Sequence, residues 1–262
     1  MTFGFVSCLD YTGNVQCAAG FQVQKVKIRN LIGAASTAGF AMMFQSAQAE
    51  TTRMHFDVTI LGLKAGELRY TLQKDDTSYA ASGLLYPTGL AATMTTFLYD
   101  VTVTGSHKGD QYLPSRYSEK SDTGKRKEER EIIYRSGVPN IRSAKLAKPH
   151  WLDPKTQKGT LDPMTAIFEI LRDVEHGNLC DQDVTLFDGA RRVRISLSNP
   201  KESGMRATCD GVYSREGGFS KNELKQGKTF PFTITYKKTD QNYYFQRFDV
   251  KSARGRAAFV RR

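Results

Sequence analysis

MHFDVTILGLKAGELRYTL, residues 54–72, is the stretch that indicates the fold most directly. Apolar side chains occupy every second position on either side of a short glycine-bounded segment: Phe56, Val58 and Ile60, then Leu68, Tyr70 and Leu72. A period of two places one face of a strand in a core and the other face in solvent. A short break containing glycine joins two such strands as a hairpin. The stretch therefore predicts an antiparallel pair.

The same period returns along most of the chain. Further alternating runs lie at residues 79–83, 99–103, 112–117, 132–134, 184–187, 193–197, 205–213, 230–237, 243–250 and 257–260. Between two of these runs stands Asp188-Gly189, a dipeptide typical of two-residue hairpin turns. About ten strands in sequence predict a mainly β fold, built as a large curved antiparallel sheet or half-barrel with two α-helices.

The two helices are predicted from a different spacing. Apolar residues recur three and four positions apart within residues 88–98, which indicates an amphipathic helix. For the second helix, Asp162 is a good N-cap and Pro163 suits the first helical position. His176 and Gly177 are expected to end it.

Two intervening segments are expected on the surface. Residues 118–131 mix Lys and Arg with Glu, which is typical of a solvated hairpin tip rather than a nucleic-acid site. Residues 140–159 contain or adjoin three prolines and carry the single Trp151, which indicates a linker.

The N-terminus has the order of an export signal. A basic cluster comes first, an apolar stretch at residues 31–44 follows, and Ala47-Gln48-Ala49 supplies a cleavage pattern. We expect cleavage between Ala49 and Glu50, which divides the chain into an N-terminal extension with signal peptide (1–49) and one β-rich extracytoplasmic domain (50–262). A buried core helix and a mitochondrial transit peptide are the alternatives for this segment. No later stretch reaches the ~20 apolar residues of a membrane span.

Charge and cysteine usage agree with export. Residues 1–49 hold three basic residues and one acidic residue, so their removal lowers the formal net charge from +11 to +9. Such a surplus favours anionic surfaces. Cys180 and Cys209 are the cysteines that remain, and an even pair in an oxidising compartment predicts a disulfide. The predicted location is the periplasm.

Motifs of catalysis, metal binding and cofactor binding are missing from the sequence. The four histidines stand alone, and no nucleophile elbow, phosphate-binding loop or dinucleotide fingerprint occurs. Asp181 and Asp183 share one face of a strand-like segment, as paired carboxylates of an acid–base or calcium site would. The neighbouring residues lack the other oxygen ligands of a calcium site, which favours a solvated strand entrance instead. We therefore expect no enzyme, no metal and no cofactor.

One basic pattern is a candidate binding feature. Arg192 and Arg194 lie two residues apart in a predicted strand and so share one face. They are a candidate anion-binding pair. The alternative is an ordinary exposed sheet face.

Short motifs distributed over residues 56–219 support a family resemblance. They are the opening strand and turn (Phe56-Asp57-Val58, Gly62, Gly66-Glu67), Leu161-Asp162-Pro163-Met164, Cys180, Phe187-Asp188-Gly189 with Arg191 and Arg192, and Cys209 before Gly217-Gly218-Phe219. The chain resembles domain of unknown function family 3108, a group of uncharacterised exported proteobacterial proteins. The resemblance implies periplasmic residence and a curved sheet similar to the half-barrels of periplasmic lipoprotein carriers. It implies no catalytic residues.

Two functions follow as hypotheses. The first is a non-catalytic periplasmic protein of cell-envelope maintenance that binds an apolar or lipid ligand in a concave sheet. The second is a periplasmic module that binds an envelope protein through a sheet edge or through residues 118–131. Neither involves nucleic acid.

Overall fold

The computed structural model describes residues 49–143, 146–252 and 255–262, in which the chain forms fourteen strands, three α-helices and one 3-10 helix. The strands are β1 (Glu50–Ile60), β2 (Leu63–Lys74), β3 (Ser78–Pro87), β4 (Leu98–Lys108), β5 (Gln111–Asp122), β6 (Lys127–Arg135), β7 (Val138–Ser143), β8 (Val174–Glu175), β9 (Asp183–Phe187), β10 (Arg192–Ser203), β11 (Arg206–Gly217), β12 (Thr229–Lys238), β13 (Asn242–Ser252) and β14 (Gly255–Arg261). The helices are α1 (Leu90–Met94), α2 (Pro163–Leu171), α3 (Lys221–Lys225) and the 3-10 helix η1 (Pro154–Thr156). None of these helices has the length and apolar character to cross a lipid bilayer.

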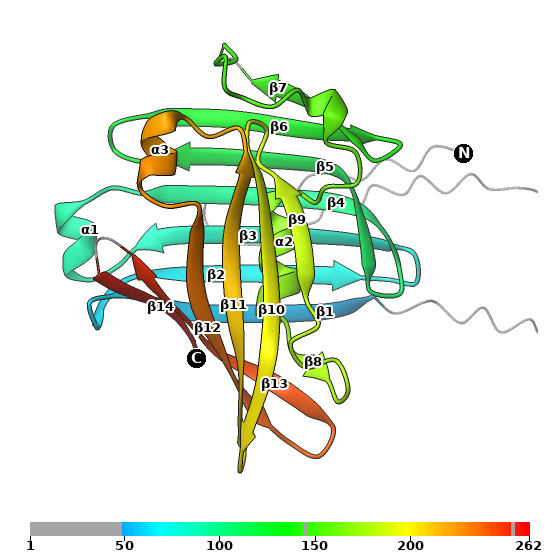
Figure 1. The fold of residues 1–262 in the computed structure, drawn as a ribbon, viewed down its shortest axis with the longest axis vertical. Helices are drawn as coiled ribbons and strands as arrows, with labels where there is room; N and C mark the ends of the chain where they lie inside the picture. Colours follow the sequence, from blue (N-terminus) through cyan, green and yellow to red (C-terminus); the bar gives the residue numbers. More distant parts are fainter. Residues whose placement is uncertain (1–48, 144–145, 253–254) are drawn as a thin grey trace, which may run out of the picture. The chain divides into compact units, whose positions relative to one another are not determined.

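All the strands belong to one antiparallel sheet, which confirms the predicted fold class. Its order is β7-β6-β5-β4-β3-β2-β1-β14-β13-β12-β11-β10-β9, with β8 attached to β13. In Figure 1, strands β1–β6 run across the view and β9–β12 run over them, with α2 between the two sets. The sheet is open, because β7 and β9 stand at the two ends of its order.

Pairing of β1 with β14 joins the two halves of the sheet. Phe56 in β1 lies opposite Arg261 in β14. Just beyond β14, the guanidinium of Arg262 pairs with the carboxylate of Glu67 in β2. Lys64 also donates to Glu67, at 2.8 Å, and is the main cause that holds the pKa of Glu67 well below its usual range. The junction is therefore closed by opposite charges on the outer face.

Both halves of the sheet pack on α2. The helix contacts β3, β4, β5 and β9. Its residues from Met164 to Leu171 are all buried except Ile167. Large side chains that are fully buried come from both halves of the sheet and include Phe56, Tyr117, Ile132, Ile234 and Phe245. A helix that is buried on nearly every side belongs to the core rather than to the surface.

The start of α2 is as predicted and its end is not. The carboxylate of Asp162 accepts hydrogen bonds from the backbone N–H groups of Met164 and Thr165, at 2.9 and 3.0 Å. Burial raises the pKa of Asp162 to about 6. The predicted end at residues 176–177 is wrong, because the helix ends at Leu171 and the chain turns into β8, which pairs with β13.

The charged stretch 118–131 is not a long hairpin tip. Strands β5 and β6 run through most of it and leave only residues 123–126 between them. Opposite charges face each other across the pair, as Lys120 does Glu129. Cross-strand pairs of opposite charge stabilise a ladder. The charges therefore extend the sheet instead of ending it.

The helix predicted over residues 88–98 is much shorter. It is reduced to α1, none of whose residues is buried. Leu90 and Met94 are 81% and 85% exposed, so the apolar stripe has no core to pack on. Phe97 packs on β2 instead, where a Cβ on Gly66 would lie 3.1 Å from the Phe97 ring.

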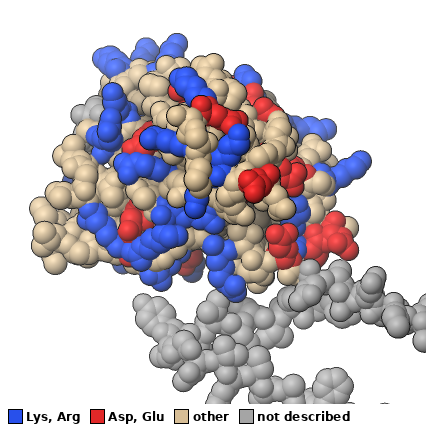
Figure 2. Space-filling model, turned by 90° about the horizontal axis from the view of Figure 1, so that it is seen from below, with Lys and Arg blue, Asp and Glu red and all other residues tan. Residues whose placement is uncertain are grey.

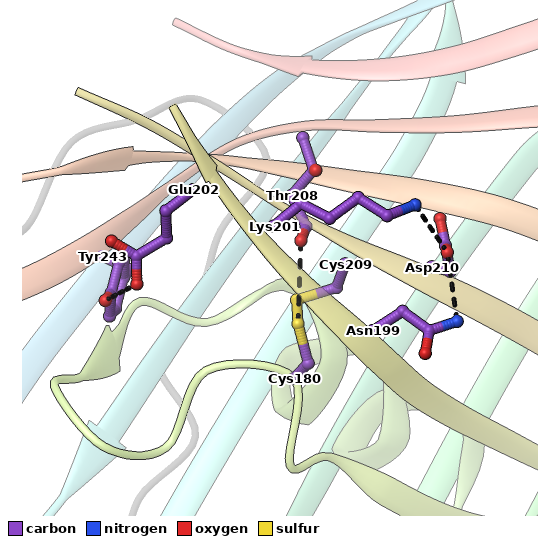
Figure 3. Close-up of a disulfide and its surroundings, with 8 residues drawn as sticks. All are labelled: Cys180, Asn199, Lys201, Glu202, Thr208, Cys209, Asp210 and Tyr243. Carbon is purple, nitrogen blue, oxygen red and sulfur yellow. Dashed lines mark hydrogen bonds and ion pairs between the residues drawn. A yellow bond between two sulfur atoms is a disulfide. The ribbon is translucent and has the colours of Figure 1, made fainter. Parts of the chain in front are cut away.

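The predicted disulfide is present. Cys180, which lies before β9, is bonded to Cys209 in β11, with the two Cα atoms 5.5 Å apart. Figure 3 shows the bond joining the loop to the strand, close to the pair formed by Lys201 and Asp210. The bridge fastens the start of β9 to the middle of the C-terminal half of the sheet.

Residues 140–159 are only partly a linker. They begin within β7 and contain η1. Immediately afterwards Leu161 forms a parallel bridge with Leu186 in β9. The Leu152 N–H donates to the carbonyl oxygen of Ala190, at 3.0 Å. Leu161, just after this segment, therefore covers part of the outer edge of β9, where unpaired backbone groups would otherwise be exposed.

Candidate ligand-binding site

A cavity of about 620 Å³ lies between α2 and the inner faces of both halves of the sheet. We name it the apolar cavity. Its large apolar lining residues are Leu68, Leu85, Val101, Met164, Ile167, Ile170, Leu171, Ile195, Phe248 and Phe259. A concave site of this size with hydrocarbon walls is typical of sites that bind small organic molecules.

Strand alternation and one glycine shape the apolar cavity. Leu85 lines it, whereas its neighbour Leu84 lies on the other face of β3 and is 37% exposed. Gly83 allows α2 to approach β3, because a Cβ there would lie 2.7 Å from the sulfur of Met164. The cavity is therefore bounded by a helix that packs closely at Gly83.

Charged side chains line one part of the cavity, which we name the charged rim. Its members are Arg126, Arg130, Lys148, Arg191, Glu119, Glu128 and Asp188. They come from β5, β6 and their turn, from the segment after β7, and from the β9–β10 turn. Four cationic and three anionic groups meet there.

Two of the rim cations are held by partners within the protein. Arg130 donates from Nη1 to the carbonyl oxygen of Asp188, at 2.5 Å. Arg191 lies with Nη2 2.7 Å from Oε1 of Glu223, and its guanidinium is 5.5 Å from the centre of the Phe219 ring. Both guanidinium groups are therefore fixed in place.

The other two rim cations are not neutralised. Within the described residues, neither Arg126 nor Lys148 forms an ion pair, and both side chains are exposed. The Lys148 ammonium lies 5.9 Å from the centre of the Trp151 ring, at the outer limit of a cation–π contact. Uncompensated cations beside an apolar cavity suit a ligand with an anionic group.

Arg192 and Arg194 do not line the apolar cavity. Arg192 lies with Nε 2.7 Å from a carboxylate oxygen of Glu216, and Arg194 pairs with Asp183. An anion that bound there would have to compete with these carboxylates. Their anion-binding role stays a prediction.

The predicted export signal lies almost wholly outside the described residues. Its last residue, Ala49, precedes β1, and Glu50 is the first residue of that strand. Asp183 is the first residue of β9, where it forms an ion pair with Arg194, and Asp181 lies two residues before the strand. In the described ranges no three His, Cys, Asp or Glu side chains are grouped so that they could hold a metal ion.

Sequence reasoning missed the charged rim. Arg126 stands in the stretch interpreted as a solvated tip, and Lys148 and Trp151 stand in the predicted linker. The one available signal was the single Trp151 in a proline-rich segment, because a large aromatic residue is seldom left without packing. Nothing local indicates that these residues meet at a cavity.

Comparisons with known proteins give a family and no activity. No curated protein matches the chain. One solved structure, entitled "Crystal Structure of Beta-barrel-like Protein of Domain of Unknown Function DUF1849 from Brucella abortus", is similar over 83% of this chain and 98% of that chain, with 11% identity and a TM-score of 0.43. The family model described as "Protein of unknown function (DUF3108)" matches residues 53–203. The chain belongs to this DUF3108 family.

Proposed function

We propose that this protein is a non-catalytic periplasmic protein that binds an amphiphile in the apolar cavity. The acyl chain lies against α2, and the anionic head lies beside Arg126 and Lys148. The observation that carries the proposal is the pairing of an apolar cavity of about 620 Å³ with two cations that have no ion-pair partner among the described residues. Ligand sites commonly combine apolar walls with a few polar groups that fix orientation.

The charge of the chain supports an anionic ligand. The formal net charge is +11 for the whole chain and +9 without residues 1–49. On the face drawn in Figure 2, Lys and Arg side chains are spread over much of the surface, whereas Asp and Glu side chains cover less of it and form their larger groups towards the right of the view. A positive field of this kind raises the rate at which anions arrive, and salt screens it.

The periplasmic part of the proposal rests on two features. The order of basic, apolar and small residues before Glu50 is that of an export signal. The Cys180–Cys209 disulfide suits an oxidising compartment. Binding rather than catalysis is favoured because hydrocarbon side chains form most of the walls around the proposed acyl chain.

The test is a titration with fatty acids of increasing length, followed by native mass spectrometry of the complexes. Each added methylene that enters the cavity contributes about 0.8 kcal/mol, or about a fourfold gain in affinity, until the cavity is full. Replacement of both Arg126 and Lys148 by Gln is expected to weaken the binding of fatty acids much more than the binding of the corresponding alcohols. Affinity that does not change with chain length contradicts the proposal.

A matched pair of variants locates the site. Leu85→Trp places a large ring in the apolar cavity and should abolish binding of the longer acids. Leu84→Trp makes the same change on the opposite face of β3 and should leave binding intact. Circular dichroism establishes that both variants fold. If the two variants lose binding equally, the acyl chain is not in this cavity.

A protein partner is the second candidate. Within the described residues, β7 pairs with no strand other than β6, so it is the edge strand at this end of the sheet, and an edge strand can receive a strand from a partner. The 3-10 helix η1 packs against β7, so a partner strand would have to displace it. Native mass spectrometry of protein purified from its own cells separates the two functions. A bound amphiphile supports the first, and a bound protein that a proline in β7 removes supports the second.

A further inference from the structure

A second cavity, of about 510 Å³, lies at the C-terminal end of α2. We name it the acidic cavity, and the residues that matter to the argument are Asp110, Glu169, Arg172, Asp181, Gln182 and Asp183. They come from the β4–β5 turn, from the end of α2 and from the segment that leads into β9. None of them lines the apolar cavity.

The charge of this cavity is opposite to that of the chain. Four carboxylates line it against one guanidinium. Asp183 is neutralised from outside by Arg194. Arg172 lies between two others, 3.3 Å from Glu169 and 3.6 Å from Asp110. Negative charge remains in surplus, although the chain carries a formal net charge of +11. Such a cavity repels anions and favours cations.

Two buried side chains in the acidic cavity have unused hydrogen-bonding atoms. Gln182 is only 6% exposed, and neither its Oε1 nor its Nε2 has a partner in the described part of the chain. Glu169 is 7% exposed, and its Oε1 also has none. Buried polar groups are normally satisfied, because leaving them unpaired costs free energy. Both residues line the acidic cavity, so a molecule there that reached these atoms would satisfy them.

We propose that the acidic cavity binds a small organic cation in which an ammonium group stands next to a hydrogen-bond acceptor. The ammonium donates to Oε1 of Glu169 and to Oε1 of Gln182. The acceptor receives a hydrogen bond from Nε2 of Gln182. A bare metal ion fits less well, because the donor of Gln182 would stay unused and no three-ligand group occurs among the described residues.

The protonation of Glu169 gives an independent readout. Burial raises the pKa of Glu169 to about 7. The charged groups that act on it are Arg172 just after its own helix, Asp110 on the β4–β5 turn and Lys74 at the end of β2, and it faces Tyr112 on β5. The ammonium binds the carboxylate form, so the affinity for an amine that itself stays protonated, such as ethanolamine, should rise as the pH increases from 6 to 8.

Calorimetric titration with ethanolamine and with glycinamide tests the proposal, with acetate and acetamide as the anionic and neutral comparisons. At least one amine should bind saturably, and acetate should not bind. Binding of ethanolamine alone indicates an amino alcohol, such as a lipid headgroup, and binding of glycinamide alone indicates an amino-acyl group. Saturable binding of neither amine overturns the proposal and leaves water as the partner of the buried atoms.

Three variants sharpen the test. Gln182→Leu should weaken amine binding at least tenfold without lowering the melting temperature, because it removes two unpaired polar atoms from the interior. Glu169→Gln should weaken binding by a similar factor and remove its pH dependence. Gln73→Leu, the same exchange on the exposed face of β2, should change nothing. Full affinity in the Gln182 and Glu169 variants overturns the proposal. The fatty-acid titration measures binding in the apolar cavity, and the amine titration measures binding in the acidic cavity. Either proposal can therefore fail without the other.

Discussion

The two cavities lie against the same short helix and yet have opposite linings. Ile167 and Ile170 face the apolar cavity, whereas Glu169 and Arg172 line the acidic cavity. Residues two apart on a helix point about 200° apart around its axis, because a turn holds 3.6 residues. A helix of nine residues thus separates a hydrocarbon site from a polar one by its faces alone. Changing one face should therefore leave the other site intact.

The largest expected effect comes from removing the disulfide. A double Cys180→Ala, Cys209→Ala variant should lose between about 3 and 4 kcal/mol of unfolding free energy, as the chain-entropy model gives for a loop of this length. Cys180 leads directly into the segment that lines the acidic cavity, so amine binding should weaken before fatty-acid binding does. Urea unfolding and the two titrations measure this. An equal loss of affinity at both cavities would show that the two cavities are not independent.

The next effect is on stability as a function of pH. Burial raises the pKa of Glu169 from 4.5 to about 7, so the folded state binds a proton more tightly than the unfolded state does. The contribution of Glu169 to stability is therefore greatest below pH 4.5 and is lost as the pH rises through about 7. The unfolding free energy of Glu169→Gln should exceed that of the parent at pH 8 by about 3 kcal/mol, and this advantage should be lost at low pH.

The difference between variant and parent is the quantity to follow, because Asp162 also titrates with a pKa raised to about 6. Glu175→Gln, at an exposed position just beyond α2, serves as the control and should match the parent throughout. A Glu169→Gln variant with the parent's stability at every pH would show that the carboxyl of Glu169 is solvated.

The smallest effect on stability and binding is expected from changes to Arg192 and Arg194, which lie outside both cavities. Replacing both Arg192 and Arg194 by Gln removes two ion pairs that are partly exposed, and such pairs are worth about 0–1 kcal/mol each. Affinity for fatty acids and for amines should stay within about twofold of the parent, by the same titrations. A loss as large as that from changing Arg126 and Lys148 would move the anion site to Arg192 and Arg194.

Local sequence features predicted most of the elements. The alternation around Phe56, the cap at Asp162 and the turn at Asp188 each depend on a few neighbouring residues, and each is found in the structure. The prediction of a long helix over residues 88–98 was wrong, because the spacing of apolar residues shows that a helix could have an apolar face. It does not show whether a core lies opposite that face. The predicted end of α2 was wrong because the residues after Leu171 form β8, which pairs with β13, a strand distant in the chain.

The candidate site was far less predictable, because it exists only after the sheet has curled. Leu68 and Phe259 line the same cavity from opposite ends of the domain. Arg126 and Lys148 resemble any solvated cation until they stand beside hydrocarbon. Nothing in the sequence marks Gln182 as a binding residue. It becomes a candidate only because the structure buries its side chain without hydrogen-bond partners among the described residues.

Pairing between the first and last strands has a consequence for how the domain folds. The hydrogen bonds between Asp57 and Arg262 span 205 residues of chain. Contacts between residues so far apart in the chain form slowly, because a large loop must close first. The entropy lost in closing that loop is offset only after the contacts have formed. During synthesis β1 therefore keeps one open edge until β14 arrives. An incomplete chain exposes that edge to other strands, so the last residues protect the first from misassembly.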